Sequence, residues 1–466
     1  MNEKRNQLWA LGILLFLIII SIVYYQINHY FIYIVAYTWF GVAYGMMLQY
    51  GRFCFASASR DLFIAGVPRM AVGVIIALIF FSLVQAILDT LGHTTFHAAP
   101  FIGLPMFISG LIFGVGMVLA GGCASGSLYK VGEGNIGNLV AVLFGLCLGQ
   151  AIFVDLGGVF DKLVPSSWEQ SALSKGIPSY IVQDGWFDKY LAGYVWNKPA
   201  IRVSDLIGLP EPWNFFIGNF LLVAVIPSLL LLLLIYVKYV RKSFLKKRAK
   251  AKGGQTNIKD ELAGFWSMIT ASKRTSLMGV LIGITAGVHI MVMKGLQLKF
   301  EVGNFGEILT RLGYIKDVSL VGTVFDPGYW YITTQEAQIG AWFLEKLGWN
   351  MHDNIFFAIN NGIPNPLLNP ALMMSIGIIL GAMIMARLNN EFSWKLPKGE
   401  MWLWALLGGI LMGFGSRPSL GCNIGAFFIR AAGGDPNGWV YAAGMIAGAF
   451  IGARFFSWWT ERKIQV

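Results

Sequence analysis

The chain has 466 residues, of which 56% are hydrophobic and 13% charged. Soluble globular proteins carry about 25% charged residues, so this composition excludes an ordinary soluble domain. The formal net charge is +11, but the basic residues concentrate in one loop between apolar segments. That distribution favours a membrane surface over nucleic acid as their partner.

Apolar runs long enough to cross a bilayer recur along the whole chain. The first follows Lys4 and Arg5, and no small-residue cleavage site comes after it, so we interpret it as a membrane helix and not as a signal peptide. About ten spans are expected, at residues 8–25, 32–50, 69–90, 106–121, 137–155, 213–237, 277–296, 371–388, 401–415 and 438–458. The sequence therefore predicts an all-α polytopic membrane protein.

The segments between the spans divide the chain. Eleven basic residues lie between Lys238 and Arg274, and the positive-inside rule places such a loop in the cytoplasm. Ten crossings then put both termini on the same side. The expected organisation is a first membrane helix (1–30), membrane repeat 1 (31–157), an outer loop (158–212), a membrane helix (213–237), a basic cytoplasmic loop (238–276), and membrane repeat 2 (277–296 and 371–466), which an outer loop (297–370) interrupts.

Two parts of the chain repeat each other at an offset of 299 residues. The segment GLIFGVGMVLAGGCASG (110–126) aligns without a gap over GILMGFGSRPSLGCNIG (409–425). Nine glycine or cysteine pairs keep the offset: Gly110/Gly409, Gly114/Gly413, Gly116/Gly415, Gly122/Gly421, Cys123/Cys422, Gly126/Gly425, Gly134/Gly433, Gly145/Gly444 and Gly149/Gly448. More weakly, the pair Gly41 and Gly45 resembles Gly283 and Gly287.

The span count gives these two copies opposite orientations. Inverted repeats are typical of transporters, with the substrate site near the midplane where the halves meet. The alternative is a duplication that produced only a stable scaffold.

Spans four and nine end in sequence that interrupts a helix. The stretch 402–415 corresponds to about 21 Å of helix, which is shorter than the hydrocarbon layer of about 30 Å. Pro418 and Gly421 follow in the second copy, and Gly121 and Gly122 in the first. We therefore predict broken half-helices that meet near the midplane.

A second short helix that begins at Ser125 or Asn423 directs free N–H groups and a positive dipole end toward the break, which suits an anion. Arg417 lies close to the break and adds a formal charge, unless its side chain extends to the membrane interface. The expected supporting anion contacts are Gly122, Ser125, Gly126, Arg417, Gly421, Asn423 and Gly425.

The four cysteines predict no disulfide. They lie in or beside apolar helices, no CxxC pair occurs and the histidines are scattered, so we expect no metal site and no cofactor. Cys123 and Cys422 occupy equivalent positions of the repeat, whereas Cys147 aligns with Ile446 and is interpreted as an ordinary apolar residue. A buried neutral thiol is a weak, soft donor, which suits an anion with a soft terminal sulfur.

At these residues the chain resembles the YeeE/YedE family of bacterial inner-membrane sulfur-compound transporters. The motifs are GRFCFASASRD (51–61), FGVGMVLAGGCASGSLYKVGEGN (113–135) and GFGSRPSLGCNIGAFF (413–428). With their flanking helices they cover most of both repeats, about 31–157 and 371–458. The long loops 158–212 and 297–370 and the basic loop depart from the smaller members, which leaves the oligomeric state and the outer vestibule open.

The resemblance implies a non-enzymatic transporter that takes up thiosulfate through a central constriction, where Cys54, Cys123 and Cys422 contact the substrate in turn. It implies a multi-pass protein of the cell inner membrane with a small cytoplasmic TusA-type sulfur-carrier protein as a partner. The charge distribution and the span count predict cytoplasmic N- and C-termini, and the basic loop predicts contact with membrane lipid. A branch of the family is associated with selenium, so a selenium compound or sulfite is the alternative substrate.

A function of another class remains open, a membrane thiol enzyme that passes sulfane sulfur between cysteines. Such chemistry needs a thiolate with a nearby base. No histidine lies near any of the three motifs, which counts against it.

Overall fold

The structure is a computed structural model, and it describes most of the membrane-embedded chain. The described residues are 2–93, 102–156, 162–163, 165–176, 191, 195–197, 202–252, 257–303, 305–314, 330, 332–351, 366–419 and 421–464. Much of the predicted outer loops 158–212 and 297–370 therefore lies outside the described residues.

Nine helices of the described chain are long and apolar enough to cross a membrane, and the shorter apolar helix α24 (Met401–Ser416) matches the ninth expected span, 401–415. The long elements are α1 (Asn2–Ile27), α2 (Ile32–Gly51), α4 (Arg69–Thr90), α5 (Leu104–Leu119), α7 (Ile136–Val140) with η2 (Ala141–Cys147) and α8 (Leu148–Asp155), α14 (Trp213–Phe215) with η4 (Phe216–Val225), α15 (Ile226–Ile235), η5 (Tyr236–Arg241) and α16 (Lys242–Lys252), α18 (Lys273–Phe300), α23 (Pro370–Leu388) and α26 (Asn437–Ile464). The prediction of an all-α polytopic membrane protein is confirmed.

Shorter elements connect these helices. They are η1 (His29–Phe31), α3 (Phe55–Ala65), α6 (Ala124–Gly132), α10 (Ser166–Ser174), α13 (Val203–Ile207), α17 (Ile258–Ile269), α19 (Gly306–Arg311), α21 (Thr333–Lys346), η6 (Pro366–Leu368), η7 (Asn423–Ile429) and α25 (Arg430–Ala432). Two short strands, β1 (Ile102–Gly103) and β2 (Val195–Asn197), pair antiparallel and are a minor departure from pure α structure.

The two repeats use equivalent glycines in equivalent helix contacts. Gly114 of α5 packs against the backbone of Met445 in α26, where a Cβ atom would clash. Gly413 of α24 packs in the same way against Leu146 of η2, and both residues of this contact are related to the first pair by the 299-residue offset. The correspondence also holds for the contacts of Gly116 and Gly415, Gly145 and Gly444, and Gly149 and Gly448.

The glycine repeat is therefore a repeat of backbone-to-backbone contacts. Small residues allow membrane helices to approach closely where lipid supplies no hydrophobic driving force.

The weaker upstream resemblance also has a structural counterpart. Helix α2 packs along α23, and α18 packs along α4. Gly41 lies against the carbonyl of Met374 in the first pair, and Gly283 lies against the carbonyl of Ala77 in the second. Each repeat therefore opens with a glycine-mediated helix pair.

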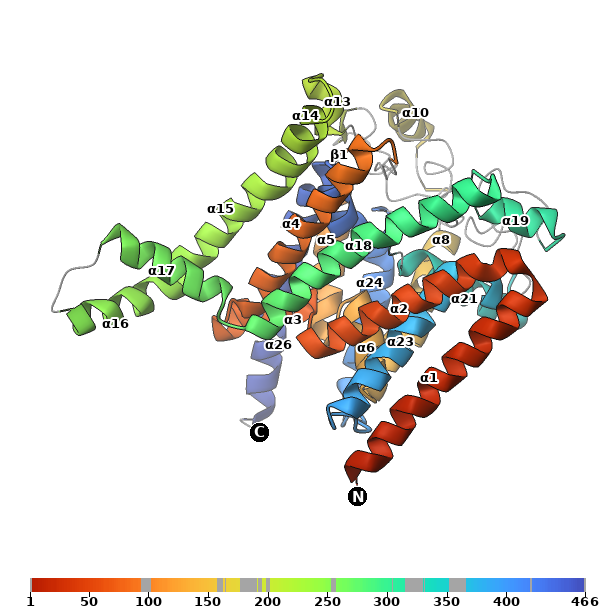
Figure 1. The fold of residues 1–466 in the computed structure, drawn as a ribbon, viewed down its shortest axis with the longest axis horizontal. Helices are drawn as coiled ribbons and strands as arrows, with labels where there is room; N and C mark the ends of the chain where they lie inside the picture. The colour runs from red at the N-terminus through yellow and green to blue at the C-terminus, as the bar shows by residue number, and fades with distance from the viewer. Residues whose placement is uncertain are drawn as a thin grey trace.

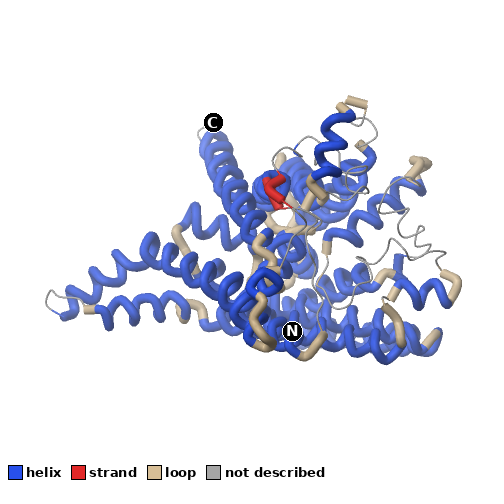
Figure 2. Tube along the Cα trace, turned by 90° about the horizontal axis from the view of Figure 1, so that it is seen from above, coloured by secondary structure: helices blue, strands red, loops and turns tan. Residues whose placement is uncertain are grey.

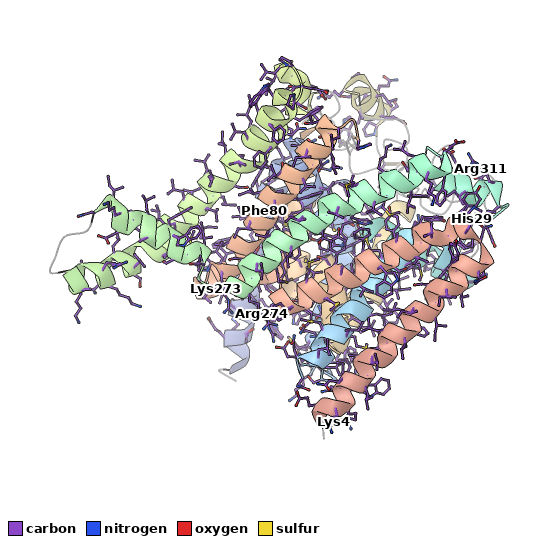
Figure 3. The ribbon with its side chains drawn as sticks, in the orientation of Figure 1. Lys4, His29, Phe80, Lys273, Arg274 and Arg311 are labelled. Atoms are coloured by element: carbon purple, nitrogen blue, oxygen red, sulfur yellow. The ribbon has the colours of Figure 1, made fainter. Side chains whose placement is uncertain are left out.

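The two termini lie at the same end of the molecule, and β1, α10 and α13 gather at the opposite end (Figure 1). Helix α18 runs from Lys273 and Arg274 toward Arg311 and His29 (Figure 3). Helices α16 and α17 project away from the bundle as an arm (Figures 1 and 2).

Candidate functional site

Each of the three motif cysteines is the residue that precedes a short helix. Cys54 is the N-cap of α3, Cys123 of α6 and Cys422 of η7, and all three have extended backbone. Helix α6 begins at Ala124, one residue before the predicted start at Ser125, and η7 begins at Asn423 as predicted. Because η7 continues into α25, the third helix extends over residues 423–432.

The breaks ahead of the cysteines arise from the expected residues. Helix α5 ends at Leu119, and Gly121 turns the chain with a φ of 71°, a value that favours glycine. Helix α24 ends at Ser416, and Pro418 follows in the turn before Cys422.

Cys54 and Cys123 lie side by side although 69 residues separate them. Their Sγ atoms are 3.7 Å apart, well beyond the S–S bond length of about 2.05 Å, and both cysteines are free and buried. The N–H of Gly126 donates to Cys123 Sγ at 3.3 Å, and Ser125 Oγ lies 3.6 Å from the same sulfur. A Cβ atom on Gly126 would lie 3.0 Å from Cys123 Sγ and closer still to Cys54 Sγ.

Cys422 has an equivalent environment in the second repeat. The N–H of Ile424 donates to its Sγ at 3.4 Å, and the backbone of Gly425 also interacts with the thiol. The adjacent Asn423 side chain is fully buried, and neither its oxygen nor its nitrogen has a hydrogen-bond partner among the described residues. An amide in this position offers both a donor and an acceptor.

Arg417 is the C-cap residue of α24, and 5% of its surface is exposed. Its side chain therefore lies inside the bundle and does not extend to the membrane interface. Cys422 follows five residues later as the N-cap of η7. A buried cation beside the third cysteine is compatible with the predicted anion contact.

Two of the predicted glycines, Gly122 and Gly421, lie in tightly packed backbone at the helix breaks, where there is no space for a side chain. A Cβ atom on Gly122 would meet Ser127 and Asn138, and one on Gly421 would meet the backbone of Gly425. The Asn138 amide donates to the Ala120 carbonyl at 3.2 Å and to Ser127 Oγ at 3.1 Å, so it ties α7 to the break. Sequence reasoning missed Asn138, because its partners lie 11 and 18 residues away.

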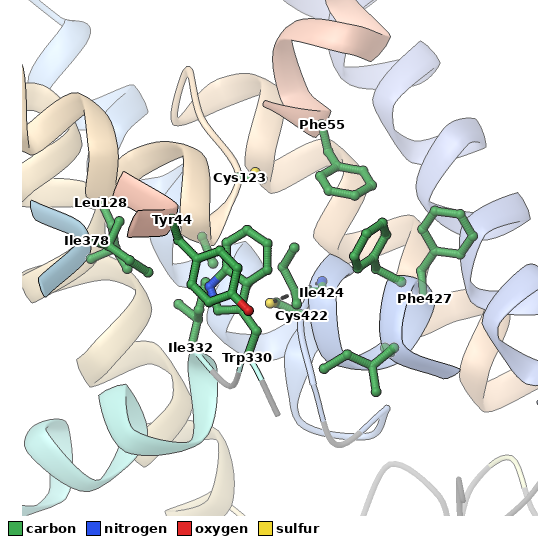
Figure 4. Close-up of a cluster of buried hydrophobic side chains, with 14 of the residues drawn as sticks. Tyr44, Phe55, Cys123, Leu128, Trp330, Ile332, Ile378, Cys422, Ile424 and Phe427 are labelled. Carbon is green, nitrogen blue, oxygen red and sulfur yellow. Dashed lines mark hydrogen bonds between the residues drawn. The ribbon is translucent and has the colours of Figure 1, made fainter. Parts of the chain in front are cut away.

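Cys123 and Cys422 belong to one buried cluster with residues of the segment predicted to be an outer loop (Figure 4). Trp330 and Ile332 of that segment belong to this cluster, and Trp330 stacks on Tyr44 of α2 with ring centroids 4.1 Å apart. The sequence carried little signal for this buried segment, because Thr333, Glu336 and Gln338 interrupt its apolar residues.

Cys147 lies in η2 and is free and buried. Its backbone carbonyl contacts Gly340 of α21, so its surroundings are those of a helix-packing position.

The arrangement brings three helix N-termini and three buried thiols to the junction of two inverted repeats. Helix N-termini stabilise negative charge, and broken backbone at membrane depth is tolerated where it is packed in protein or lines a polar cavity. The fold and the site define a membrane transport protein built from inverted repeats.

The chain belongs to the YeeE/YedE family, whose description is sulphur transport and whose pattern matches residues 50–451. The predicted family is therefore confirmed.

Individual relatives are named as transporters. The chain is similar to the thiosulfate transporter TsuA of Escherichia coli (strain K12), with 26% identity over 431 residues, 91% of this chain and 95% of the relative. It is also similar to the thiosulfate transporter TsuA of Spirochaeta thermophila, with 26% identity over 388 residues, 83% of this chain and 88% of the relative. A shorter match joins it to the probable transporter YedE of Salmonella typhimurium, 33% identical over 134 residues, 28% of this chain and 32% of the relative.

Proposed function

We propose that this protein takes up thiosulfate across the bacterial inner membrane, and that Cys54, Cys123 and Cys422 contact the anion in turn. The observation that carries the proposal is that each cysteine caps the N-terminus of a short helix at a break in the repeat. The relatives named thiosulfate transporter support the choice of substrate.

The three positions supply two complementary interactions. Helix N-termini provide most of the stabilisation of negative charge. Neutral thiols add weak S–H contacts to a soft sulfur, and a series of weak sites allows the ion to leave again. The 3.7 Å separation of the Cys54 and Cys123 sulfurs supports a direct hand-over between those two contacts.

The test is growth of a sulfur-uptake-deficient bacterium on thiosulfate as the sole sulfur source. We expect Cys54→Ala, Cys123→Ala and Cys422→Ala to impair growth, with wild-type abundance in the membrane. Cys147→Ala is the matched control, because Cys147 is equally buried but lies at a helix contact. Growth of all three variants at the wild-type rate would exclude the relay.

The same strain distinguishes the alternative functions. Uptake of radiolabelled selenite or sulfite in preference to thiosulfate would show that the substrate is one of those anions and not thiosulfate. A persulfide trapped on one of the cysteines during turnover would favour the membrane thiol enzyme, because a contact relay forms no covalent intermediate.

The arm formed by α16 and α17 is the proposed contact for the inner membrane surface and for a partner. It carries the basic residues that we assign to the cytoplasmic side. Anionic lipid is the first proposed ligand, and a TusA-type sulfur-carrier protein is the second. The proposed TusA-type partner is tested by cross-linking in cells. We expect a TusA-type protein to cross-link to α16, and we expect the cross-link to be lost when the charges of the α16 lysines are reversed.

A further inference from the structure

A narrow groove runs between α15 and the helices of the bundle. Its volume is about 220 Å³, and most of its floor consists of buried apolar side chains. Four elements contribute to this floor, through Phe55 of α3, Val74 of α4, Phe427 of η7 and Ala442 of α26. Leu234 of α15 lines the open side of the groove and is 65% exposed. Because α15 is part of a membrane span, the groove opens toward lipid.

The groove offers little to a water-soluble ligand. Among the described residues that line it, only Ser59, Lys238, Tyr239 and Trp439 have polar side chains. The indole N–H of Trp439 already donates to the carbonyl of Val223 at 2.7 Å. An anion such as thiosulfate would lose its hydration in such surroundings without enough hydrogen bonds in return. The groove therefore suits a hydrocarbon chain and lies outside the proposed anion path.

Lys238 of η5 places a positive charge at one end of the groove. It is the only charged residue among the described residues of the lining, and its ammonium group lies 5.3 Å from the centre of the Tyr239 ring. Within the described chain it pairs with no carboxylate, whereas the neighbouring Arg241 pairs with Glu261 at 2.7 Å. An apolar recess that ends at an uncompensated cation is complementary to an amphiphile with an anionic headgroup.

The position of Lys238 along its span indicates the leaflet. It lies where the span leads into the basic residues of α16, and the positive-inside rule assigns that end to the cytoplasm. From Leu231 to Lys238 the helix rises by about 10 Å, so the apolar part of the groove lies below the headgroup layer. A helix of a partner protein is about 10–12 Å across and does not fit a recess of about 220 Å³. A single acyl chain is narrow enough.

We propose that this groove binds one anionic phospholipid of the cytoplasmic leaflet, with an acyl chain along α15 and the headgroup phosphate at Lys238. The site is distinct from the surface contact proposed for the arm, because its residues belong to helices of the bundle and to α15 and η5. It goes beyond the proposed function and does not depend on which anion is transported. Phe55 directly follows Cys54 in the chain, so the lipid packs against the helix that Cys54 caps.

The test is photolabelling of the purified full-length protein in detergent. The probes are phosphatidylglycerol and phosphatidylcholine that carry a diazirine in one acyl chain, each added at one equivalent. We expect the label in peptides that contain Leu234 or Ile446, both of which line the groove. Phosphatidylglycerol should label about fivefold more strongly, the factor that about 1 kcal/mol for one basic residue represents.

The charge of Lys238 is tested by three variants. Lys238→Gln should lower labelling by phosphatidylglycerol to the level of phosphatidylcholine, and Lys238→Arg should keep the preference because it keeps the charge. Lys246→Gln is the matched control. Lys246 lies in α16 and does not line the groove, so its loss should leave the preference unchanged.

The apolar part of the groove is tested by Ala71→Leu, which narrows it without a change of charge. We expect labelling by both probes to fall by at least about fivefold. Ala249→Leu makes the same change in α16, outside the groove, and should label as the wild type does. If Ala71→Leu does not give a monodisperse protein, the lysine variants decide by themselves.

Equal labelling of the wild type by the two probes would overturn the proposal, and so would an unchanged preference in Lys238→Gln. Native mass spectrometry gives a further decision. A dimer that Ala71→Leu dissociates would assign the groove to a second copy of the chain instead of a lipid. None of these results bears on thiosulfate uptake, which the growth test judges separately.

Discussion

A single hydrogen atom in place of a side chain decides how closely two thiols approach in the first repeat. Gly126 packs against the sulfurs of both Cys54 and Cys123, and its N–H donates to Cys123 Sγ. A larger residue at this position would displace one of the sulfurs and change their distance of 3.7 Å. The glycine therefore sets the space available at these two thiols although it has no side chain.

Gly126→Ala is expected to impair transport and leave the fold intact. Overpacking of a tight site costs about 1–3 kcal/mol, and we expect the uptake rate to fall by roughly tenfold, the factor that about 1.4 kcal/mol represents. Radiolabelled thiosulfate uptake in cells measures it.

The control for that variant is Gly295→Ala. Gly295 lies in α18, and a Cβ atom added to it would meet no other atom within 4 Å, so the change should leave uptake at the wild-type level. Equal uptake by both variants would show that the sulfurs have more room than the structure indicates.

At the scale of helices, the repeat is a set of matched contacts. Gly448 packs against Leu111, and Gly149 packs against Ile410, which are the same contact in the two halves. The helix pairs α5–α26 and α24–α8 thus depend on glycine at equivalent positions.

We therefore expect Gly448→Val and Gly149→Val both to lower the thermal unfolding temperature in detergent. The effect of Gly448→Val should be larger, because a Cβ atom added there would overlap the Leu111 carbonyl oxygen, whereas one added to Gly149 would lie 3.0 Å from Ile410 Cα. Each places two methyl groups against a neighbouring backbone, and such overpacking costs about 1–3 kcal/mol. Gly12→Val is the control, because Gly12 of α1 has open space around it. A loss in one repeat alone would mean that the two contacts are not equivalent in energy.

Helix α17 has an apolar stripe that no described part of the chain covers. Ile258 is 80% exposed, and Leu262 and Trp266 are each 65% exposed. The stripe adjoins α15 at an apolar groove lined by Leu233 and Leu262, and Glu261 and Arg241 pair at 2.7 Å beside it. An exposed stripe that adjoins a membrane span fits an interfacial helix.

A spin label on Leu262→Cys should therefore be more accessible to oxygen than to a water-soluble nickel reagent in nanodiscs with anionic lipid. A label on Lys250→Cys of α16 should show the opposite preference. The unsubstituted protein is the background, since its cysteines are buried. Preference for nickel at position 262 would place the stripe in water, and spin–spin broadening would indicate a contact between two copies.

For the whole molecule, the position of the termini at one end predicts the topology (Figure 1). With the basic arm on the inside, as the positive-inside rule predicts, we expect both termini to be cytoplasmic. We expect a green fluorescent protein fused after residue 466 to fluoresce and a phosphatase fused there to be inactive. A phosphatase inserted near residue 170 of α10 should be active, and the reverse pattern would invert the orientation.

Much of the fold was predictable because its causes are local in the sequence. The ten apolar spans, the breaks at Gly121 and Pro418 and the repeat about Cys123 and Cys422 follow from hydropathy, helix-breaking residues and alignment of the chain with itself. A helix that must cross a hydrocarbon layer needs about 20 apolar residues, and this requirement can be read without knowing its neighbours.

The sequence predicted the cysteines and glycines of the site where the same residue occurs at equivalent positions of both repeats. Both copies carry the cysteine and its glycines, so Cys123 and Cys422 stand out from the sequence, whereas Cys54 was added by the family resemblance. Asn138 was not predicted, since its amide donates to residues that are 11 and 18 positions away in the chain.

The sequence by itself determined that this is a membrane protein of two inverted repeats with a cysteine at each break. Only the tertiary structure decided that Cys54 lies against Cys123, that Gly126 packs against both sulfurs, and that α21 enters the bundle and packs against η2. The reason is that spans and breaks are set by a residue and its near neighbours in the lipid. Contacts between side chains depend on how helices far apart in the chain pack together.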